Sequence, residues 1–246
     1  MSESSTTISL IDYSIFCGEL SEISIDKKVL INTLNQYSFC MAEEDFKFKE
    51  ALQASDVLLP DGIAIVKAVK LLTGRLIKKI AGADVHLHLL KELNKKGGKC
   101  FYLGSSENTL LKIRERLSKE FPAIQVQAFP PPHKLEFSEL ENKQMIETIN
   151  ACQPDVLFIG MTAPKQEIWA HFHKEQVNAK IICSVGAAFD FYAGTVKRPS
   201  PFWIKLGLEW FIRLIKEPRR MWKRYLYYGP VFVGMILRRG LKSNNN

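Results

Sequence analysis

Hydrophobic positions along the chain form short runs that alternate with stretches of helical periodicity. Runs of consecutive apolar, often β-branched residues are typical of buried strands, and six such runs are Val29–Leu34, Val57–Leu59, Lys99–Leu103, Ile124–Ala128, Val156–Ile159 and Ile181–Val185. The stretches between them repeat apolar residues at helical spacing, most clearly in Gly62–Leu72, Asp84–Lys96, Glu107–Phe121, Ser138–Cys152 and Lys165–Gln176. Continuous apolar strands separated by helices predict an α/β fold, a doubly wound, mostly parallel sheet with helices on both faces.

Small, polar and ionisable residues gather directly after the predicted strands. Asn35 follows the first of these strands, Pro-Asp-Gly at 60–62 the second and Gly-Ser-Ser at 104–106 the third. The last two strands are followed by the segments 160–167 and 186–190. Because ligands of open α/β sheets bind outside the carboxyl ends of the strands, we expect a ligand site along this edge.

The positive charge of the chain is concentrated near its end. The net charge is +8, yet residues 197–239 alone hold eleven Lys and Arg against two acids, so the rest of the chain is close to neutral. We therefore divide the chain into a core, residues 1–195, and a basic helical appendage, residues 196–246. Trp203, Trp210 and Trp222 are interleaved with these cations, a pattern typical of contact with an anionic membrane surface.

The residues leave two other interpretations of the appendage open. One is a solvated helical segment that docks by its Leu and Phe face, and the other, less favoured, is a nucleic-acid-binding surface. If one helix continues past Pro218, Arg213, Arg220 and Arg224 share a stripe, because their spacing is seven and four. The longest apolar stretch, 225–237, contains Gly229, Pro230 and Gly234 and is too short to span a bilayer.

The cysteines, the histidines and the first residues of the chain together predict a cytoplasmic protein without a metal site. The five cysteines include no pair with CxxC spacing, which favours reduced thiols in a cytoplasmic protein. The histidine pairs at 86/88 and 171/173 have i, i+2 spacing, which places them on different helix faces, so we expect surface residues and no metal site. The first residues lack the pattern of a secretory signal, and both ends are expected to be frayed.

Asp61 is a carboxylate at a strand end, before a glycine and an apolar helix. Partial burial by Leu58, Leu59 and Ile63 would raise its pKa toward the value that suits a general base. The alternative is a helix N-cap aspartate, which spacing alone favours.

Two further segments combine a helix start with groups that suit phosphate or sugar. Gly104 and Ser105 precede a predicted helix whose free N–H groups suit a phosphate, although the same residues also fit a simple capped turn. GxGxxG is absent, which argues against a standard dinucleotide site. Lys165 and Gln166 follow Pro164 at another helix start, where Lys would neutralise a phosphate and Gln would bind a sugar or base; an ordinary helix start is the alternative.

Several of these motifs, taken in order, resemble the WecG/TagA/CpsF family, which are bacterial glycosyltransferases of family 26. The resemblance runs from about Leu30 to Tyr225 and is carried by LLPDGIAIV (58–66), IAGAD (80–84), FYLGS (101–105), PDVLFIGMTAPKQE (154–167), VGAAFDFYAGTVKRPSP (185–201) and LGLEWFIRLIKEPRR (206–220). It implies an inverting transfer of a hexose from a UDP-sugar, with neither metal nor other cofactor. The implied acceptor is a polyprenyl-diphosphate-linked sugar at the cytoplasmic face of the bacterial membrane, in teichoic acid, common antigen or exopolysaccharide synthesis.

The resemblance also assigns roles to individual residues. Asp61 matches the proposed general base, and Thr33 and Asn35 match residues that line the sugar and acceptor side. Gln166 matches the glutamine of PKQE, and Asp190 matches an acid near the uracil. The appendage is implied to close the site at the membrane, with Arg213, Arg220 and Arg224 stabilising the leaving diphosphate.

The chain departs from the family pattern at two places. Lys79 stands where the family usually has Arg, which keeps the charge but loses the bidentate fork. The segment FPPPHKLEF, 129–137, replaces the Gly-Tyr region of the family, with Phe129 or His133 as candidates for base stacking.

The residues leave two other functions open, a non-catalytic, membrane-associated nucleotide-binding module and a Rossmann-like dehydrogenase. The missing GxGxxG disfavours the dehydrogenase. The donor sugar (N-acetylmannosamine, its uronic acid or glucose) and the oligomeric state, a homo-oligomer included, are not fixed by the sequence.

Overall fold

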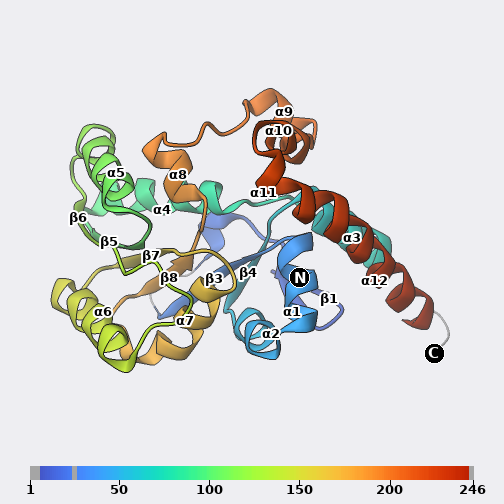
Figure 1. Cartoon of the computed structure of the whole chain (residues 1–246), viewed down its shortest axis with the longest axis horizontal. Coiled ribbons are helices and arrows are strands. Elements are labelled where there is room, and N and C mark those ends of the chain that lie inside the picture. Colours follow the sequence, from blue (N-terminus) through green and yellow to red (C-terminus); the bar gives the residue numbers. More distant parts are fainter. Residues whose placement is uncertain (1–5, 24–26, 244–246) are drawn as a thin grey trace, which may run out of the picture.

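The computed structural model describes residues 6–23 and 27–243, and its centre is one eight-stranded sheet (Figure 1). The strand order is β1-β2-β4-β3-β8-β7-β5-β6. Only β1 and β2 pair antiparallel, and all other neighbours are parallel. The strands are β1 (Thr7–Leu10), β2 (Tyr13–Phe16), β3 (Val29–Leu34), β4 (Val57–Pro60), β5 (Lys99–Gly104), β6 (Gln125–Phe129), β7 (Val156–Gly160) and β8 (Ile181–Ser184). The predicted α/β, mostly parallel sheet is confirmed.

Helices cover both faces of this sheet (Figure 1). One face is covered by α4 (Gly82–Lys96), α5 (Glu107–Glu120) and α8 (Ala188–Ala193), and the other by α6 (Glu139–Cys152) and α7 (Lys165–His173). The remaining helices are α1 (Gln36–Glu44), α2 (Phe46–Gln53), α3 (Ile63–Thr73), α9 (Pro201–Lys205), α10 (Glu209–Lys216), α11 (Pro218–Trp222) and α12 (Tyr228–Ser243). A π-helical turn, η3 (Lys223–Tyr227), joins α11 to α12, and two short 3-10 turns are η1 (Leu20–Glu22) and η2 (Lys174–Gln176).

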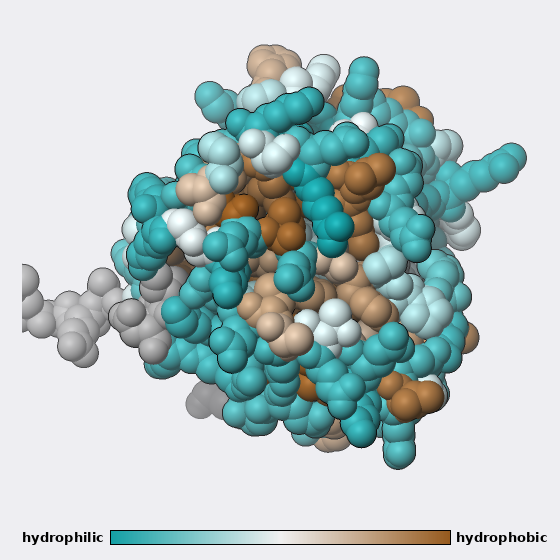
Figure 2. Space-filling model, turned by 90° about the vertical axis from the view of Figure 1, so that its left-hand side faces the viewer, coloured by the Kyte–Doolittle hydropathy of each residue, from teal (hydrophilic) through white to brown (hydrophobic). Residues whose placement is uncertain are grey.

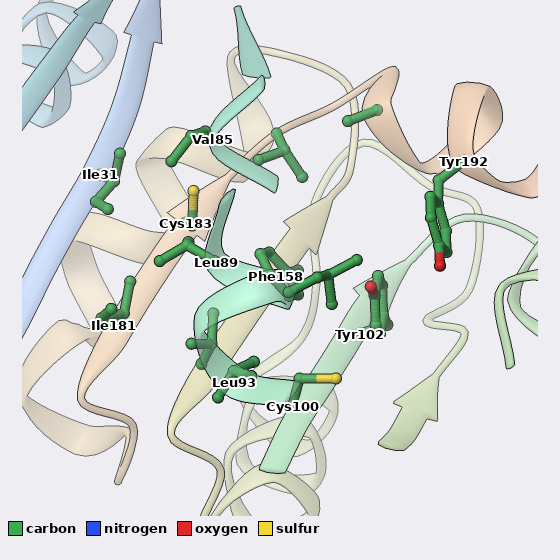
Figure 3. Packing of buried hydrophobic residues seen from close by; sticks show 14 of the residues in the cluster. Ile31, Val85, Leu89, Leu93, Cys100, Tyr102, Phe158, Ile181, Cys183 and Tyr192 are labelled. Carbon is green, nitrogen blue, oxygen red and sulfur yellow. The ribbon is translucent and has the colours of Figure 1, made fainter. Parts of the chain in front are cut away.

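The largest core cluster shows how α4 fixes the sheet beneath it. Val85, Leu89 and Leu93 recur every fourth residue and are buried, so α4 presents one apolar stripe. Figure 3 shows these side chains above the strands, near Tyr102 and Phe158. This packing holds β3, β8, β7 and β5 in one layer, and the residues that follow three of these strands build the cavity described below.

The edge of the sheet at β6 is the most solvated part of the sheet. Figure 2 looks onto this side of the molecule, where hydrophilic residues cover most of the face and hydrophobic ones gather in a hollow near its centre. None of the five β6 side chains is fully buried. Such a short edge strand limits pairing with another chain.

The β1–β2 hairpin and the helices α1, α2 and α8 were not among the elements named from the sequence pattern. The β1–β2 hairpin turns at Ile11 and Asp12, and Ile11 has a φ of 59°. A β-branched residue seldom adopts this left-handed conformation, so the turn lacks its usual Asn-Gly signal. Helix α1 begins at a capping box in which Ser38 and the N-cap Asn35 bond reciprocally.

The C-terminal segment packs on the core instead of standing apart from it. On α12, Tyr228, Phe232 and Ile236 are buried at a spacing of four, and the Phe232 ring meets Phe39 of α1 edge-on at 5.2 Å. Farther along, Arg239 pairs with Glu43 on α1. The apolar stripe of α12 is therefore part of the core, as in the interpretation of a helix docked by its apolar face.

The expectation that the histidine pairs lie on the surface is wrong for His86. Its side chain is buried and its Nε2 lies 2.8 Å from the Tyr102 hydroxyl. Burial lowers the pKa of His86 to about 3, so it stays neutral in the core. His88, His171 and His173 are partly exposed, and His133 is exposed.

In the described part of the chain, no helix is long and apolar enough to cross a membrane. The cysteines 40, 100, 152 and 183 are buried free thiols. The expected fraying at both ends concerns residues that lie outside the described ones, 1–5 and 244–246.

We predict that Phe232→Ala lowers the free energy of unfolding by about 3–5 kcal/mol, because a buried aromatic ring leaves a cavity. The neighbouring Val233 is 53% exposed, so Val233→Ala serves as the matched control and should change stability by less than about 0.5 kcal/mol. Chemical denaturation measures both. Equal, small effects would show that α12 does not pack on the core in solution.

Candidate active site

A polar cavity of about 180 Å³ lies at the carboxyl ends of β4, β3, β8 and β7. These four strands are neighbours in the sheet, so the residues that follow them meet at one place. The backbone N–H of Asp61 donates to the carbonyl of Leu34 at 2.8 Å, which fixes the end of β4 beside the end of β3. The predicted site residues that line the cavity are Thr33, Asn35, Asp61, Gln166, Asp190, Arg213, Arg220 and Arg224.

Asp61 lies at the end of β4, where the chain turns into α3. The N-cap of α3 is Gly62, with a φ of 111°, so the alternative that Asp61 caps this helix is wrong. Burial is the main cause that raises the pKa of Asp61 to about 6, and the carboxylates of Glu209 and Asp84 raise it further. Lys79 and Arg213 act in the opposite direction. A carboxyl with this pKa is largely ionised at pH 7 and still basic enough to accept a proton.

Lys79, the cation that lowers the pKa of Asp61 most, forms an ion pair with Glu209. Lys79 Nζ donates to Glu209 Oε2 at 2.6 Å, and both side chains are largely buried. Glu209 also lies 3.8 Å from Arg198, which bonds to Asp84 at 2.9 Å. These alternating charges join the core to α10. The sequence analysis named neither Glu209 nor Arg198 as site residues, because their role depends on a fold-back that no local motif encodes.

Three arginines of the C-terminal segment line the cavity, although not from one helix. Glu217 has non-helical backbone angles, and the segment divides into α10, α11, η3 and α12, so the condition for a shared stripe, one helix that continues past Pro218, is not met. The guanidinium of Arg213 lies 5.4 Å from the Phe191 ring, and that of Arg224 lies 4.7 Å from the Tyr37 ring. Arg220 pairs with Glu217 at 2.9 Å. The breaks between helices, not their periodicity, bring the cations together.

Thr33 and Asn35 line the cavity from the end of β3. The Asn35 side chain already accepts hydrogen bonds from the backbone of Tyr37 and Ser38, both at 3.0 Å. Its Oδ1 is therefore occupied by the cap of α1, and its amide N–H₂ is the group that remains to meet a ligand.

Gln166 and Glu167 form a buried pair on α7 that faces the cavity. Gln166 Nε2 donates to Glu167 Oε1 at 2.8 Å, which leaves Gln166 Oε1 and Glu167 Oε2 buried without a partner in the described residues. Burial raises the pKa of Glu167 to about 7. Unpartnered buried oxygens suit the hydroxyl or N–H donors of a sugar. Glu167 was not singled out from the sequence, although it completes PKQE.

Asp190 lines the cavity from α8. Its Oδ1 accepts from the hydroxyl of Thr195 at 3.3 Å, and its backbone carbonyl accepts from Val196. The side chain is therefore held at the start of the segment that leads to α9.

Four predicted site residues do not line the cavity, namely Lys79, whose amine is held by Glu209, and Gly104, Ser105 and Lys165. Gly104 has a φ of 123°, and a Cβ there would lie 2.5 Å from the carbonyl oxygen of Gly160, so this glycine permits close approach of β5 and β7. Ser105 follows it, and Ser106 caps α5, which supports the simple capped turn. The amine of Lys165 donates to the carbonyl of Lys134 at 2.6 Å, away from the expected cleft. Phe129 and His133 are not lining residues either.

Among residues 6–23 and 27–243, no group of three or more His, Cys, Asp or Glu side chains is arranged to hold a metal ion. The expectation of a metal-independent reaction stays a prediction.

Comparison with known proteins connects this geometry to a family. The model of the glycosyl transferase WecG/TagA/CpsF family matches residues 5–246. A Bacillus subtilis (strain 168) protein is 33% identical over 225 residues, which is 90% of this chain and 83% of the relative. Relatives from Bacillus spizizenii and Staphylococcus aureus (strain MW2) are 29% and 28% identical, over 89% and 72% of this chain and 83% and 66% of their own lengths. All three are named N-acetylglucosaminyldiphosphoundecaprenol N-acetyl-β-D-mannosaminyltransferase.

We predict that Asp61→Asn raises the free energy of unfolding at pH 7 by about 1–3 kcal/mol, since one pKa unit corresponds to about 1.4 kcal/mol. The folded pKa of about 6 exceeds the ordinary 3.8, so the folded state binds more protons between these values and wild-type stability falls as pH rises through this window.

Denaturation at several pH values measures the difference between the two proteins. It should be largest above pH 6 and smallest below pH 4, where the wild-type carboxyl is protonated in both states. A stability difference between the two proteins that does not depend on pH would show that burial does not destabilise the ionised form of Asp61.

Proposed function

This chain belongs to the WecG/TagA/CpsF family of glycosyl transferases, and we propose that it transfers N-acetylmannosamine from a UDP-sugar to a polyprenyl-diphosphate-linked N-acetylglucosamine. The names of the three relatives support this transferred sugar and this acceptor, and UDP as the carrier of the sugar rests on the family resemblance. The observation that carries the proposal is a carboxylate of raised pKa in a cavity that three arginines line. The polymer that results is a component of the bacterial cell surface.

Asp61 acts as the general base in this proposal. It takes the proton of the acceptor hydroxyl while that oxygen forms a bond to the anomeric carbon of the donor sugar. The bond from this carbon to the diphosphate oxygen breaks, and its electron pair leaves with UDP. A single displacement inverts the anomeric configuration, which agrees with a β-linked product from an α-linked donor.

The arginines neutralise the leaving diphosphate. Negative charge grows on UDP as the bond breaks, and a reaction without metal needs fixed cations there. Arg213 has a buried Nε without a partner in the described part of the chain, so it has a donor to offer. Each such contact is worth about 2–4 kcal/mol of the barrier, by analogy with lost oxyanion donors. Gln166, Glu167 and Asp190 would bind the sugar and the nucleoside.

The C-terminal segment has to move for the donor to enter. The cavity of about 180 Å³ is smaller than the roughly 300–1,000 Å³ of typical ligand clefts. Its arginines come from the segment after residue 200, so an outward shift of this segment enlarges the cavity and its return supplies the cations.

We place the protein at the cytoplasmic face of the membrane, held peripherally by the same segment. More than half of the exposed large hydrophobic side chains in the described residues lie after residue 200, among them Trp203 and Trp222. Lys and Arg are interleaved with them. Exposed aromatics among cations suit a lipid headgroup region, where the polyprenyl acceptor is held.

The test is incubation of the purified protein with a panel of UDP-sugars and a soluble N-acetylglucosaminyl-diphosphate lipid, with products identified by mass spectrometry. We expect transfer of N-acetylmannosamine, and Asp61→Asn should lower kcat by roughly 10²–10⁴ while UDP affinity changes less than about twofold.

Asp45→Asn is the matched control, because Asp45 caps α2 and asparagine caps equally well. Near-normal turnover of Asp61→Asn would remove Asp61 from the mechanism. UDP binding by the wild type without any transfer would favour the non-catalytic nucleotide-binding module.

A further inference from the structure

A second, larger hollow opens beside the polar cavity. It is a groove of about 990 Å³ between α3, the α9–α10 region and α12. Figure 1 shows α12 running alongside α3, and the groove lies between them. The function proposed above does not use it.

The groove begins at the reacting groups. Asp61, Asn35, Tyr37, Glu209, Arg213 and Arg224 line both the groove and the polar cavity. The two hollows therefore meet at the carboxylate of Asp61, with two of the three arginines at the junction. A ligand in the groove presents one end to Asp61 and to these cations.

Away from this junction the walls are mostly apolar. Ile63 and Ala64 of α3 line the groove together with Ile204 and Leu208, and Phe232 and Ile236 contribute from α12. The lining side chains of Leu71, Leu206, Val233 and Leu237 are 50–63% exposed. An apolar channel that joins a charged, partly buried site to exposed leucines fits a molecule with a charged head and a long hydrocarbon tail.

We infer that this groove binds the first isoprene units of the acceptor's polyprenyl chain. The inference rests on the proposed function, which supplies an acceptor of this chemistry. The sugar hydroxyl of the acceptor then lies at Asp61, and its diphosphate lies in the groove, whose lining includes Lys67 and Lys205, so that the arginines remain with the leaving diphosphate of UDP. The exposed leucines direct the rest of the chain toward the membrane, and the polar cavity is left to the UDP-sugar.

Chain length gives this assignment a measurable consequence. Each methylene that enters an apolar groove adds about 0.8 kcal/mol, which is roughly fourfold in affinity. We expect kcat/KM to rise by at least about tenfold from the methyl to the geranyl and farnesyl esters of N-acetylglucosaminyl diphosphate. The assay contains no membrane or detergent, so that partition into a lipid phase does not contribute.

Two glycines of α12 provide a matched pair of variants. Gly229 lines the groove and Gly234 does not, and at both positions an added Cβ meets no atom within 4 Å. Gly229→Phe should reduce the ratio of farnesyl to methyl kcat/KM from about tenfold or more to near one, mainly through KM. Gly234→Phe should keep the wild-type ratio. Ala64→Phe fills the groove from the opposite wall and serves if Gly229→Phe does not fold.

The outcomes separate the inference from the proposed function. No transfer by the wild type to any ester would overturn the proposed function. Transfer at rates that do not depend on chain length would overturn the groove while leaving the proposed function intact. Equal ratios for Gly229→Phe and Gly234→Phe would also overturn it, because the hydrocarbon would then bind elsewhere.

Discussion

The ion pair between Lys79 and Glu209 is the contact on which the candidate site depends. A lysine beside a partly buried aspartate ordinarily pairs with it and holds the pKa of the carboxyl low. Here the amine lies 2.6 Å from a carboxylate of α10, so Asp61 is left without that direct partner. Burial then dominates and raises the pKa of Asp61 to about 6. The C-terminal segment thus contributes to the basicity of a group that lies on the core.

This contact also joins the core to the C-terminal segment, and both contribute residues to the same cavity. The sheet supplies Asp61 and the polar side chains at its strand ends, and the segment after residue 200 supplies Glu209 and the arginines. Movement of this segment changes the cavity, the groove and the environment of Asp61 together. Removal of residues 196–246 would take away part of the buried core, because Met221, Phe232 and Ile236 belong to it.

The sequence predicted the sheet and much of the cavity because both depend on local rules. Continuous apolar runs identified six of the eight strands, and the strand-end rule pointed to Asp61 and Gln166. The hairpin was missed because its turn uses Ile11 in a left-handed conformation. Glu209 and Arg198 were missed because their partners lie more than a hundred residues away, at Lys79 and Asp84.

Lys165 and Gly104 illustrate the opposite error. Each stands at a strand end or helix start of the right kind, yet the amine of Lys165 bonds to Lys134 and Gly104 allows two strands to approach. A motif fixes the backbone position, whereas the direction of a side chain depends on the neighbours that the fold brings to it. The family resemblance pointed to Arg213, Arg220 and Arg224, and all three line the cavity, although no single helix carries them.

The account is tested most directly by NMR titration of the Asp61 side-chain carboxyl carbon, in the wild type and in Glu209→Gln. We predict a midpoint at about pH 6 in the wild type and a lower one in the variant, because Lys79 is then released toward Asp61 and a negative charge is lost. A wild-type midpoint near the ordinary 3.8, unchanged in Glu209→Gln, would contradict the claim that the C-terminal segment tunes this carboxylate.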